Sequence, residues 1–279
     1  MTARVDRTFA RAREENRSIL IAYLCIGDPS VEASLQIARA LLDAGADMLE
    51  LGAPFSDPTA DGPTIARAAT RAIAGGGSMR AAISVGARLR EQSEAPLVLF
   101  GYVNPIVVHG ERKTAQACAA AGIDGLLVVD LPPEEGSELR SEAKALGVDV
   151  IPLLTPTSQE ARIAAAREVG SGFVYSVSVT GVTGKAHRNE GAEDPFDAAA
   201  AAAARLRTAM SLPVVVGFGI DDADKARRAC GSGVRDAGAD GVVVGTAIVK
   251  AIEEARGDVA LACDRAAAVI AAIRGGLTR

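Results

Sequence analysis

The stretch AGADMLELG (Ala44 to Gly52) decides the fold predicted for this chain. A small residue, a glycine and an aspartate close a polar segment and lead directly into a short apolar run. Glycine favours the left-handed backbone that ends a helix, and a run of four to six apolar residues suits a strand buried on both faces. The stretch therefore predicts a joint between a helix and a buried strand.

Variants of this phrase return along the chain. They are AGID before GLLVVD (121–124), LGVD before VIPLL (146–149), VGSG before FVYSV (169–172) and AGAD before GVVVG (237–240). Three further apolar runs, Ile19 to Leu24, Pro96 to Gly101 and Pro213 to Gly217, have the same length and composition. Together these runs predict eight strands, near residues 19, 47, 96, 124, 148, 172, 213 and 240.

Helical patterns separate the predicted strands, at residues 31–42, 79–91, 134–146, 159–169 and 223–230. Alternating strands and helices over about 250 residues are typical of a (β/α)8 TIM barrel, an α/β fold, whereas a doubly wound sheet more usually has five or six strands. We expect one domain over residues 1–279, with an N-terminal helical extension, an additional helix at 63–74 and a closing helix at 259–273. The alanine run 198–204 is expected to be helical, because alanine is the best helix former.

The composition excludes several classes of protein. There are 30 Lys and Arg against 35 Asp and Glu, a net charge of −5, and no basic run that would suit a nucleic acid or a membrane surface. The first apolar run, Ile19 to Gly27, ends at Asp28-Pro29 and predicts neither a signal peptide nor a membrane span. A cytoplasmic protein is expected.

Metal and cofactor motifs are missing from the sequence. Four widely spaced cysteines and only two histidines, His109 and His187, give no zinc spacing and little material for a His-dependent nucleophilic mechanism. The cysteines are expected to be core residues in a reducing compartment. Walker and dinucleotide fingerprints are also absent, so we expect no cofactor and no metal.

A carboxyl group lies among leucines in the second predicted strand. In the run MLELG, Glu50 lies near the C-terminal end of the strand, where the active sites of such barrels are found. Burial disfavours the charged carboxylate and raises its pKa toward the range of a general acid or base. The alternative is a structural carboxylate that pairs with a buried Lys or Arg.

The loop after this strand, APFSDPTADGP (53–63), carries two more carboxylates on a stiff, proline-rich turn. Either Asp57 or Asp61 could lie over the barrel mouth near Glu50, and two carboxyls in different environments could divide acid and base roles. Alternatively, Asp61 caps the helix that begins at Pro63. Spacing alone does not decide between these readings.

Three glycine-rich segments follow the last three predicted strands, at 180–184, 217–220 and 245–247. Backbone without Cβ atoms can approach an anion closely, and Gly245-Thr246 opens a helix whose free N–H groups favour phosphate. Loops after strands 7 and 8 are the recurrent phosphate site of this barrel. A phosphorylated substrate is therefore expected.

Several motifs together resemble one known family. They are LELGAPFSDPTADGPTI (49–65), GYVNP (101–105), GIDGLLVVDLPPEE (122–135), YSVSVTGVTG (175–184), GFGI (217–220) and DGVVVGTAIVK (240–250). In order and over nearly the whole chain they resemble the tryptophan synthase α subunit family. That resemblance implies the cofactor-free retro-aldol cleavage of indole-3-glycerol phosphate to indole and glyceraldehyde 3-phosphate, a lyase reaction of tryptophan biosynthesis.

The resemblance also assigns roles to residues. Glu50 matches the acid/base carboxylate that protonates indole C3, and Asp61 matches the carboxylate that holds the indole N–H and stays ionised. Substrate-binding positions would be Tyr23, Phe100, Leu127, Tyr175, Thr183 and Phe218, and the phosphate cradle would comprise Gly184, Gly219, Gly245 and Thr246. Asp57, Pro58, Asn104 and Pro132 match the face that meets a pyridoxal-phosphate β subunit, as in an α2β2 heterotetramer.

The chain departs from the family pattern at a few places. Cys25-Ile26 replaces the usual Thr-Ala, Thr246 replaces a more usual Ser, and the segments 185–196 and 230–235 are longer than usual. These departures bear on loop closure and on coupling to a β subunit more than on the cleavage itself. A standalone indole-3-glycerol phosphate lyase and a weakly active, allosteric subunit are therefore kept as alternatives. A phosphate-binding barrel isomerase would leave the Asp61 loop unexplained.

Overall fold

The structure is a computed structural model of the chain, and it describes residues 2–177, 194–217, 219–234 and 236–278. Within these ranges nine parallel strands form one sheet in the order β5-β4-β3-β2-β1-β9-β8-β7-β6. Their bounds are β1 Ile19–Cys25, β2 Met48–Gly52, β3 Leu97–Gly101, β4 Gly125–Val128, β5 Asp149–Val150, β6 Leu153–Leu154, β7 Val174–Val177, β8 Val214–Gly217 and β9 Gly241–Val244.

The two ends of this sheet order, β5 and β6, are consecutive in the chain and close the ring. Pro152 lies between them and has no N–H to donate, which interrupts the ladder. On one side the Ile151 N–H donates to the Leu126 carbonyl at 2.9 Å, and on the other the Tyr175 N–H donates to the Pro152 carbonyl at 2.9 Å. The expected (β/α)8 barrel is confirmed, with its fifth strand split in two.

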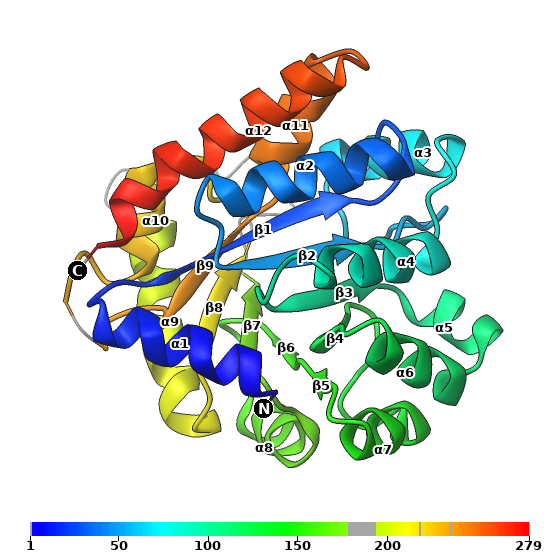
Figure 1. Cartoon of the computed structure of the whole chain (residues 1–279). Helices are drawn as coiled ribbons and strands as arrows, with labels where there is room; N and C mark the ends of the chain where they lie inside the picture. The colour runs from blue at the N-terminus through cyan, green and yellow to red at the C-terminus, as the bar shows by residue number, and fades with distance from the viewer. Residues whose placement is uncertain (1, 178–193, 218, 235, 279) are drawn as a thin grey trace.

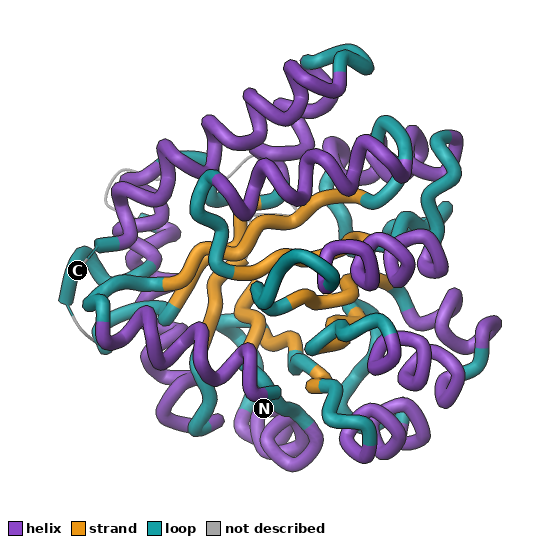
Figure 2. The backbone as a smooth tube through the Cα atoms, viewed as in Figure 1, coloured by secondary structure: helices purple, strands orange, loops and turns teal. Residues whose placement is uncertain are grey.

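Most of the helices surround the strands on the outside, and α1 lies across one end of the barrel (Figures 1 and 2). They are α1 Ala3–Glu14, α2 Val31–Asp43, α3 Pro63–Ala74, α4 Met79–Arg90, α5 Val103–His109, α6 Glu111–Ala120, α7 Ser137–Ala145, α8 Glu160–Val169, α9 Pro195–Met210, α10 Ala223–Ala229, α11 Thr246–Glu254 and α12 Val259–Arg274, followed by a 3-10 turn at Gly275–Leu277. The alanine run 198–204 lies inside α9, as expected. None of the helices in the described ranges is both long and apolar enough to cross a bilayer.

The core has two layers, and strand alternation separates them. One cluster fills the barrel interior and includes Tyr23, Met48 and Phe100. The other lies between the strands and the helices and includes Leu49 and Leu51. Since Met48 faces inward and its neighbours face outward, the period of two along β2 directs Glu50 into the interior as well.

The aspartates of the recurring phrase lie at the N-terminal ends of the strands, at the opposite end from Glu50. Asp47, Asp124 and Asp240 are buried, and each accepts the N–H of a residue in the neighbouring strand segment, Leu20, Leu97 and Val214, at 2.9 Å. The fourth, Asp149, accepts the Thr2 N–H at 2.6 Å. Buried backbone N–H groups need partners, so Asp47, Asp124 and Asp240 join adjacent strands, while Asp149 holds the start of α1.

The N-terminal helix α1 covers this end of the barrel. Its arginines reach three of the aspartates: Arg4 to Asp124 at 3.2 Å, Arg11 to Asp47 at 3.6 Å and Arg13 to Asp240 at 3.6 Å. Phe9 of α1 packs on Phe173 with ring centroids 5.9 Å apart.

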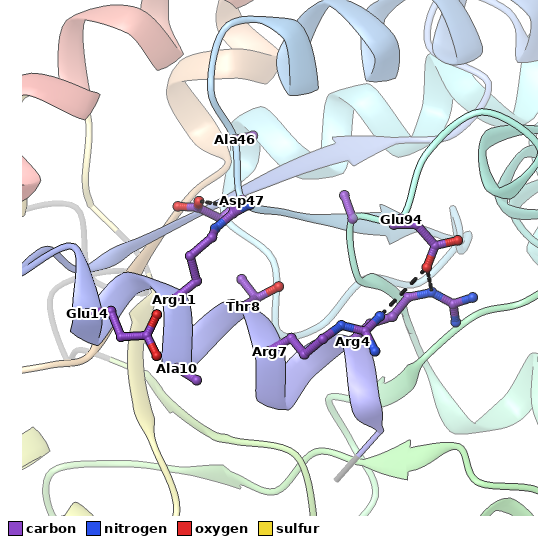
Figure 3. Close-up of a pocket in the computed structure, with 10 residues that line it drawn as sticks. Arg4, Arg7, Thr8, Ala10, Arg11, Glu14, Ala46, Asp47 and Glu94 are labelled. Atoms are coloured by element: carbon purple, nitrogen blue, oxygen red, sulfur yellow. Dashed lines mark hydrogen bonds and ion pairs between the residues drawn. The ribbon is translucent and has the colours of Figure 1, made fainter.

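A cavity of about 510 Å³ lies along α1 (Figure 3). Arg4 pairs there with Glu94 at 2.8 Å and Arg11 pairs with Asp47. The charged groups of this cavity pair with one another, and the cavity lies at the N-terminal ends of the strands, where TIM barrels carry features that stabilise the fold. We therefore assign this cavity a structural role.

Candidate active site

The C-terminal ends of the strands carry a second, more apolar cavity. It brings together residues that are far apart in the sequence: Tyr23, Glu50, Asp61, Ile65, Phe100, Tyr175, Gly219, Ile220, Val243, Gly245 and Thr246. Its free volume is about 40 Å³, below the roughly 300 Å³ at which small-molecule pockets begin.

Glu50 lies at the base of this cavity, between Tyr23 of β1 and Val98 of β3 in the strand register. The residue is 0% exposed, and neither carboxyl oxygen has a hydrogen-bond partner among the described residues. Burial raises the pKa of Glu50 from 4.5 to about 8. The alternative of a structural ion pair is wrong within the described ranges, because no Lys or Arg meets this carboxyl there.

Asp61 lines the same cavity from the loop between β2 and α3. The N-cap of α3 is Gly62 with no side-chain cap, so the helix-capping alternative for Asp61 is wrong. Its Oδ2 instead accepts a hydrogen bond from the Tyr102 hydroxyl at 3.0 Å. Burial raises the pKa of Asp61 from 3.8 to about 6, and the Tyr102 bond lowers it. Asp57, the other carboxylate of the loop, is exposed to solvent.

The two carboxyls therefore have different proton affinities in one cavity. With pKa values of about 8 for Glu50 and about 6 for Asp61, Glu50 is mostly protonated and Asp61 mostly ionised at pH 7. Asp61 is partly exposed, and the order of the two pKa values agrees with the roles that the resemblance implies, with Glu50 the proton donor and Asp61 ionised. A proton donor and an anion in a partly dry cavity suit general acid catalysis with electrostatic stabilisation of a cation.

Aromatic side chains form the walls of the cavity. Tyr23 and Phe100 meet edge to face, with ring centroids 5.2 Å apart and planes at 75°. Tyr175 is 3% exposed, and its hydroxyl lies so close to Gly217 that a Cβ there would collide with it. A Cβ at Gly52 would likewise come within 2.6 Å of the Tyr23 hydroxyl. The glycines at the strand ends thus make room for both tyrosines.

The expected phosphate cradle is described in part. Gly219, Gly245 and Thr246 line the cavity on the side of β8 and β9. Helix α11 begins at Thr246 and has no side-chain cap, so its first N–H groups remain available to an anion. Thr183, Gly184 and Phe218, also expected to bind substrate, lie outside the described residues, as does His187. Leu127 is buried in the interior cluster but is not among the residues that line the cavity.

Tyr102 is the residue that sequence reasoning missed. It is 3% exposed, follows β3 directly and bonds to Asp61. Its place in the motif GYVNP, immediately after a strand, was the available signal. His109 ends α5 and its Nδ1 lies 3.1 Å from the Thr114 hydroxyl, which satisfies it outside this cavity.

The residues expected at a partner interface surround the same end of the barrel. Asp57 and Pro58 lie in the β2–α3 loop, Asn104 on α5, and Pro132 in the loop between β4 and α7. Val107 and Val108, also on α5, are 56% and 81% exposed. These two valines are exposed apolar residues on the same helix as Asn104.

Comparison with known proteins places the chain among close relatives. A family model described as tryptophan synthase alpha chain matches residues 9–274. The tryptophan synthase alpha chain of Geotalea uraniireducens is 43% identical over 275 residues, covering 99% of this chain and 98% of that protein. That of Geobacter sulfurreducens is 45% identical over 251 residues, covering 90% of each.

Solved structures agree with the sequence relatives. The tryptophan synthase subunit alpha of Legionella pneumophila superposes with a TM-score of 0.87 at 31% identity, covering 99% of this chain and 98% of that one. A chain of the aminoacrylate-bound tryptophan synthase of Mycobacterium tuberculosis gives a TM-score of 0.83 at 32% identity, covering 99% of each.

Fold and site together define the class of protein. A closed (β/α)8 barrel with a buried carboxylic acid and a second carboxylate at the C-terminal ends of its strands is built as an enzyme barrel. The chain belongs to the tryptophan synthase alpha chain family.

Proposed function

We propose that this chain cleaves indole-3-glycerol phosphate to indole and glyceraldehyde 3-phosphate as a carbon–carbon lyase, the alpha reaction of tryptophan synthase. The protonated carboxyl of Glu50 donates its proton to indole C3. The bond between C3 and the glycerol carbon then breaks, its electron pair restores the aromatic ring, and the adjacent hydroxyl becomes the aldehyde. The carboxylate of Glu50 takes up the hydroxyl proton, which returns the site to its starting state.

Asp61 supports this reaction through its negative charge. Protonation at C3 places positive charge on the indole ring, and an ionised Asp61 that accepts the ring N–H stabilises that charge as it develops. Tyr23, Phe100 and Tyr175 bound the space for a flat aromatic ring. Gly219, Gly245 and Thr246 supply backbone for the phosphate at the other end of the substrate.

One observation carries the proposal. Glu50 is fully buried, and its two oxygens lack partners in the described part of the chain. An unpaired buried carboxyl costs stability, and such a group is retained where chemistry requires it. Its position in one cavity with Asp61 also counts against a subunit that serves only as an allosteric activator.

We propose further that the chain works with a pyridoxal-phosphate-dependent β chain, in an α2β2 assembly. The supporting feature is α5, which follows β3 at the C-terminal end of the barrel and carries Asn104 and the exposed Val107 and Val108. Indole is apolar, and a partner docked beside the cavity can receive it without release to water.

The test is the product analysis of the purified chain. Incubated with indole-3-glycerol phosphate, the chain is expected to form indole and glyceraldehyde 3-phosphate in equal amounts. Addition of a tryptophan synthase β chain is expected to increase the rate of indole formation. Rapid indole formation that no β chain stimulates would favour the standalone lyase. No indole under either condition would refute the proposed function.

A further inference from the structure

Tyr102 occupies a rigid position between β3 and α5. It is the N-cap residue of α5 and is 3% exposed. The next residue, Val103, donates its N–H to the Asp130 carboxylate at 2.7 Å, which fixes the start of the helix. The Phe55 ring packs against the Tyr102 ring with centroids 5.2 Å apart. These contacts leave the Tyr102 hydroxyl little freedom to move.

The Tyr102 hydroxyl makes two hydrogen bonds to the loop between β2 and α3. It accepts the N–H of Ala60 at 3.2 Å and lies 3.0 Å from Oδ2 of Asp61. A backbone N–H can only donate, so the single hydroxyl proton is free to point at the carboxylate. No described residue donates to the other oxygen, Oδ1, which remains available to a substrate N–H.

We infer that Tyr102 is a positioning residue of the cleavage reaction, holding Asp61 in the cavity as an ionised acceptor through the bond to Oδ2. The inference rests on the proposed function. Tyr102 does not touch the reacting atoms in this scheme and acts only through Asp61. A hydrogen bond donated to a carboxylate favours its charged form, which is the form that stabilises a cationic ring.

Among the described residues, the other titratable groups near Asp61 do not donate to its carboxylate. In that part of the chain, the ionisable side chains of the surrounding strands are Tyr23 and Cys25 of β1, Glu50 of β2 and Tyr175 of β7. Burial raises the pKa of Cys25 to about 12 and that of Glu50 to about 8, and it raises the pKa of both tyrosines further above their ordinary value. All four are therefore mostly neutral at pH 7, and none is a cation.

The test compares Tyr102→Phe with the wild-type chain across pH. The variant keeps the ring contact with Phe55 but loses the hydroxyl, so the acid limb of kcat/KM, near pH 6 for Asp61, is expected to move up by about one pH unit. At pH 6 the ionised fraction of Asp61 falls from about one half to about one tenth, so kcat/KM is expected to fall roughly fivefold, and at pH 7.5 the loss is expected to be smaller. Phe55→Leu is the matched control, because it removes the ring contact and leaves the hydroxyl; its acid limb should stay in place.

A direct titration separates this inference from the proposed function. Carboxyl NMR of chains labelled with ¹³C-aspartate, with Asp61→Asn to assign the resonance, reports the Asp61 pKa without any substrate. A higher Asp61 pKa in Tyr102→Phe supports the inference even if the wild-type chain releases no indole. An unchanged Asp61 pKa and an unmoved acid limb would overturn it, whether or not the wild-type chain is active.

Discussion

At the scale of the residue, Glu50 shows how a catalytic group costs stability. Its carboxyl is buried without a partner in the described ranges. Ionisation of this carboxyl is therefore disfavoured in the folded chain, whereas in the unfolded chain it ionises at its ordinary pKa of 4.5. Between pH 4.5 and about 8 the folded chain holds a proton on Glu50 that the unfolded chain has lost. The contribution of Glu50 to stability therefore falls as pH rises through this window.

Glu50→Gln should stabilise the chain at neutral pH. Glutamine is neutral in both states, so the variant avoids the penalty. For a pKa of about 8 in the folded chain against 4.5 in the unfolded one, we expect a gain of about 4 kcal/mol at pH 7.5. Urea unfolding of both chains at pH 4 and pH 7.5 measures it. The difference should disappear at pH 4, where glutamic acid is protonated in both states; a gain of equal size at both pH values would refute the explanation.

The pH dependence of activity should be bell-shaped. The reaction needs Asp61 ionised and Glu50 protonated, so kcat/KM is expected to rise with the ionisation of Asp61 near pH 6 and to fall with that of Glu50 near pH 8. Initial rates of indole formation from pH 5 to 9.5 test this. Activity that keeps rising above pH 9 would show that Glu50 is not the required acid.

Site residues differed in how far the sequence could predict them. The burial of Glu50 was predictable because it lies between two leucines in a short apolar strand. Asp61 was ambiguous, since Asp-Gly-Pro is also a helix start, and only the loop conformation places the N-cap at Gly62. Tyr102 was not found, because its role depends on the contact of its hydroxyl with a loop 41 residues earlier in the chain.

At the scale of the element, the strand-joining aspartates explain the recurring phrase. Asp124 is 2% exposed and accepts hydrogen bonds from the Leu97 N–H, from Arg90 at 2.8 Å and from Arg4 at 3.2 Å. The position of the aspartate before each strand was visible in the sequence. Its use in joining neighbouring strands and in holding α1 was not, because those partners come from distant parts of the chain.

Asp124→Asn should destabilise the fold strongly. Asparagine lacks the negative charge that pairs with the guanidinium groups of Arg4 and Arg90. Breaking a buried ion pair costs about 3 kcal/mol. Glu94→Gln is the matched control, since Glu94 pairs with the same Arg4 but is 74% exposed in its side chain. The urea midpoint should drop clearly for Asp124→Asn and stay nearly constant for Glu94→Gln; equal midpoints in the two variants would count against the strand-joining role.

Two element boundaries differ from those predicted from the sequence. The fifth strand was expected as one run, but Pro152 divides it into β5 and β6. The helix expected from residue 134 begins at Ser137, because Gly136 adopts a left-handed backbone with φ of 69° after the turn at Pro132 and Pro133. In both cases proline or glycine geometry prevailed over the apolar pattern.

At the scale of the whole molecule, the two ends of the barrel have different tasks. The N-terminal end contains the paired charges under α1. The C-terminal end contains the cavity with Glu50, which has no partner in the part of the chain that the structure describes. Repeated strand patterns predicted the closed barrel well, because each strand is a short buried run that only a parallel sheet can use.

The proposed docking face gives a prediction at this scale. Val108→Asp places a charge on an 81% exposed valine of α5 and should weaken binding of a β chain at least tenfold, without loss of basal cleavage. Val234→Asp, on a 60% exposed valine in the loop before β9 at the opposite end of the barrel, is the control. Titration of the β-stimulated rate gives both affinities. Equal affinities of the two variants for the β chain would show that Val108 does not lie in the interface.

The most direct measurement is the rate of indole formation from indole-3-glycerol phosphate by the wild-type chain and by Glu50→Gln at pH 7. A general acid contributes about 10² to 10⁴-fold, so the variant, although folded and more stable, should be at least 100-fold slower in kcat. Glu32→Gln, which changes an exposed carboxylate on α2, should match the wild type. Equal rates for the wild type and Glu50→Gln would contradict the assignment of Glu50 as the proton donor.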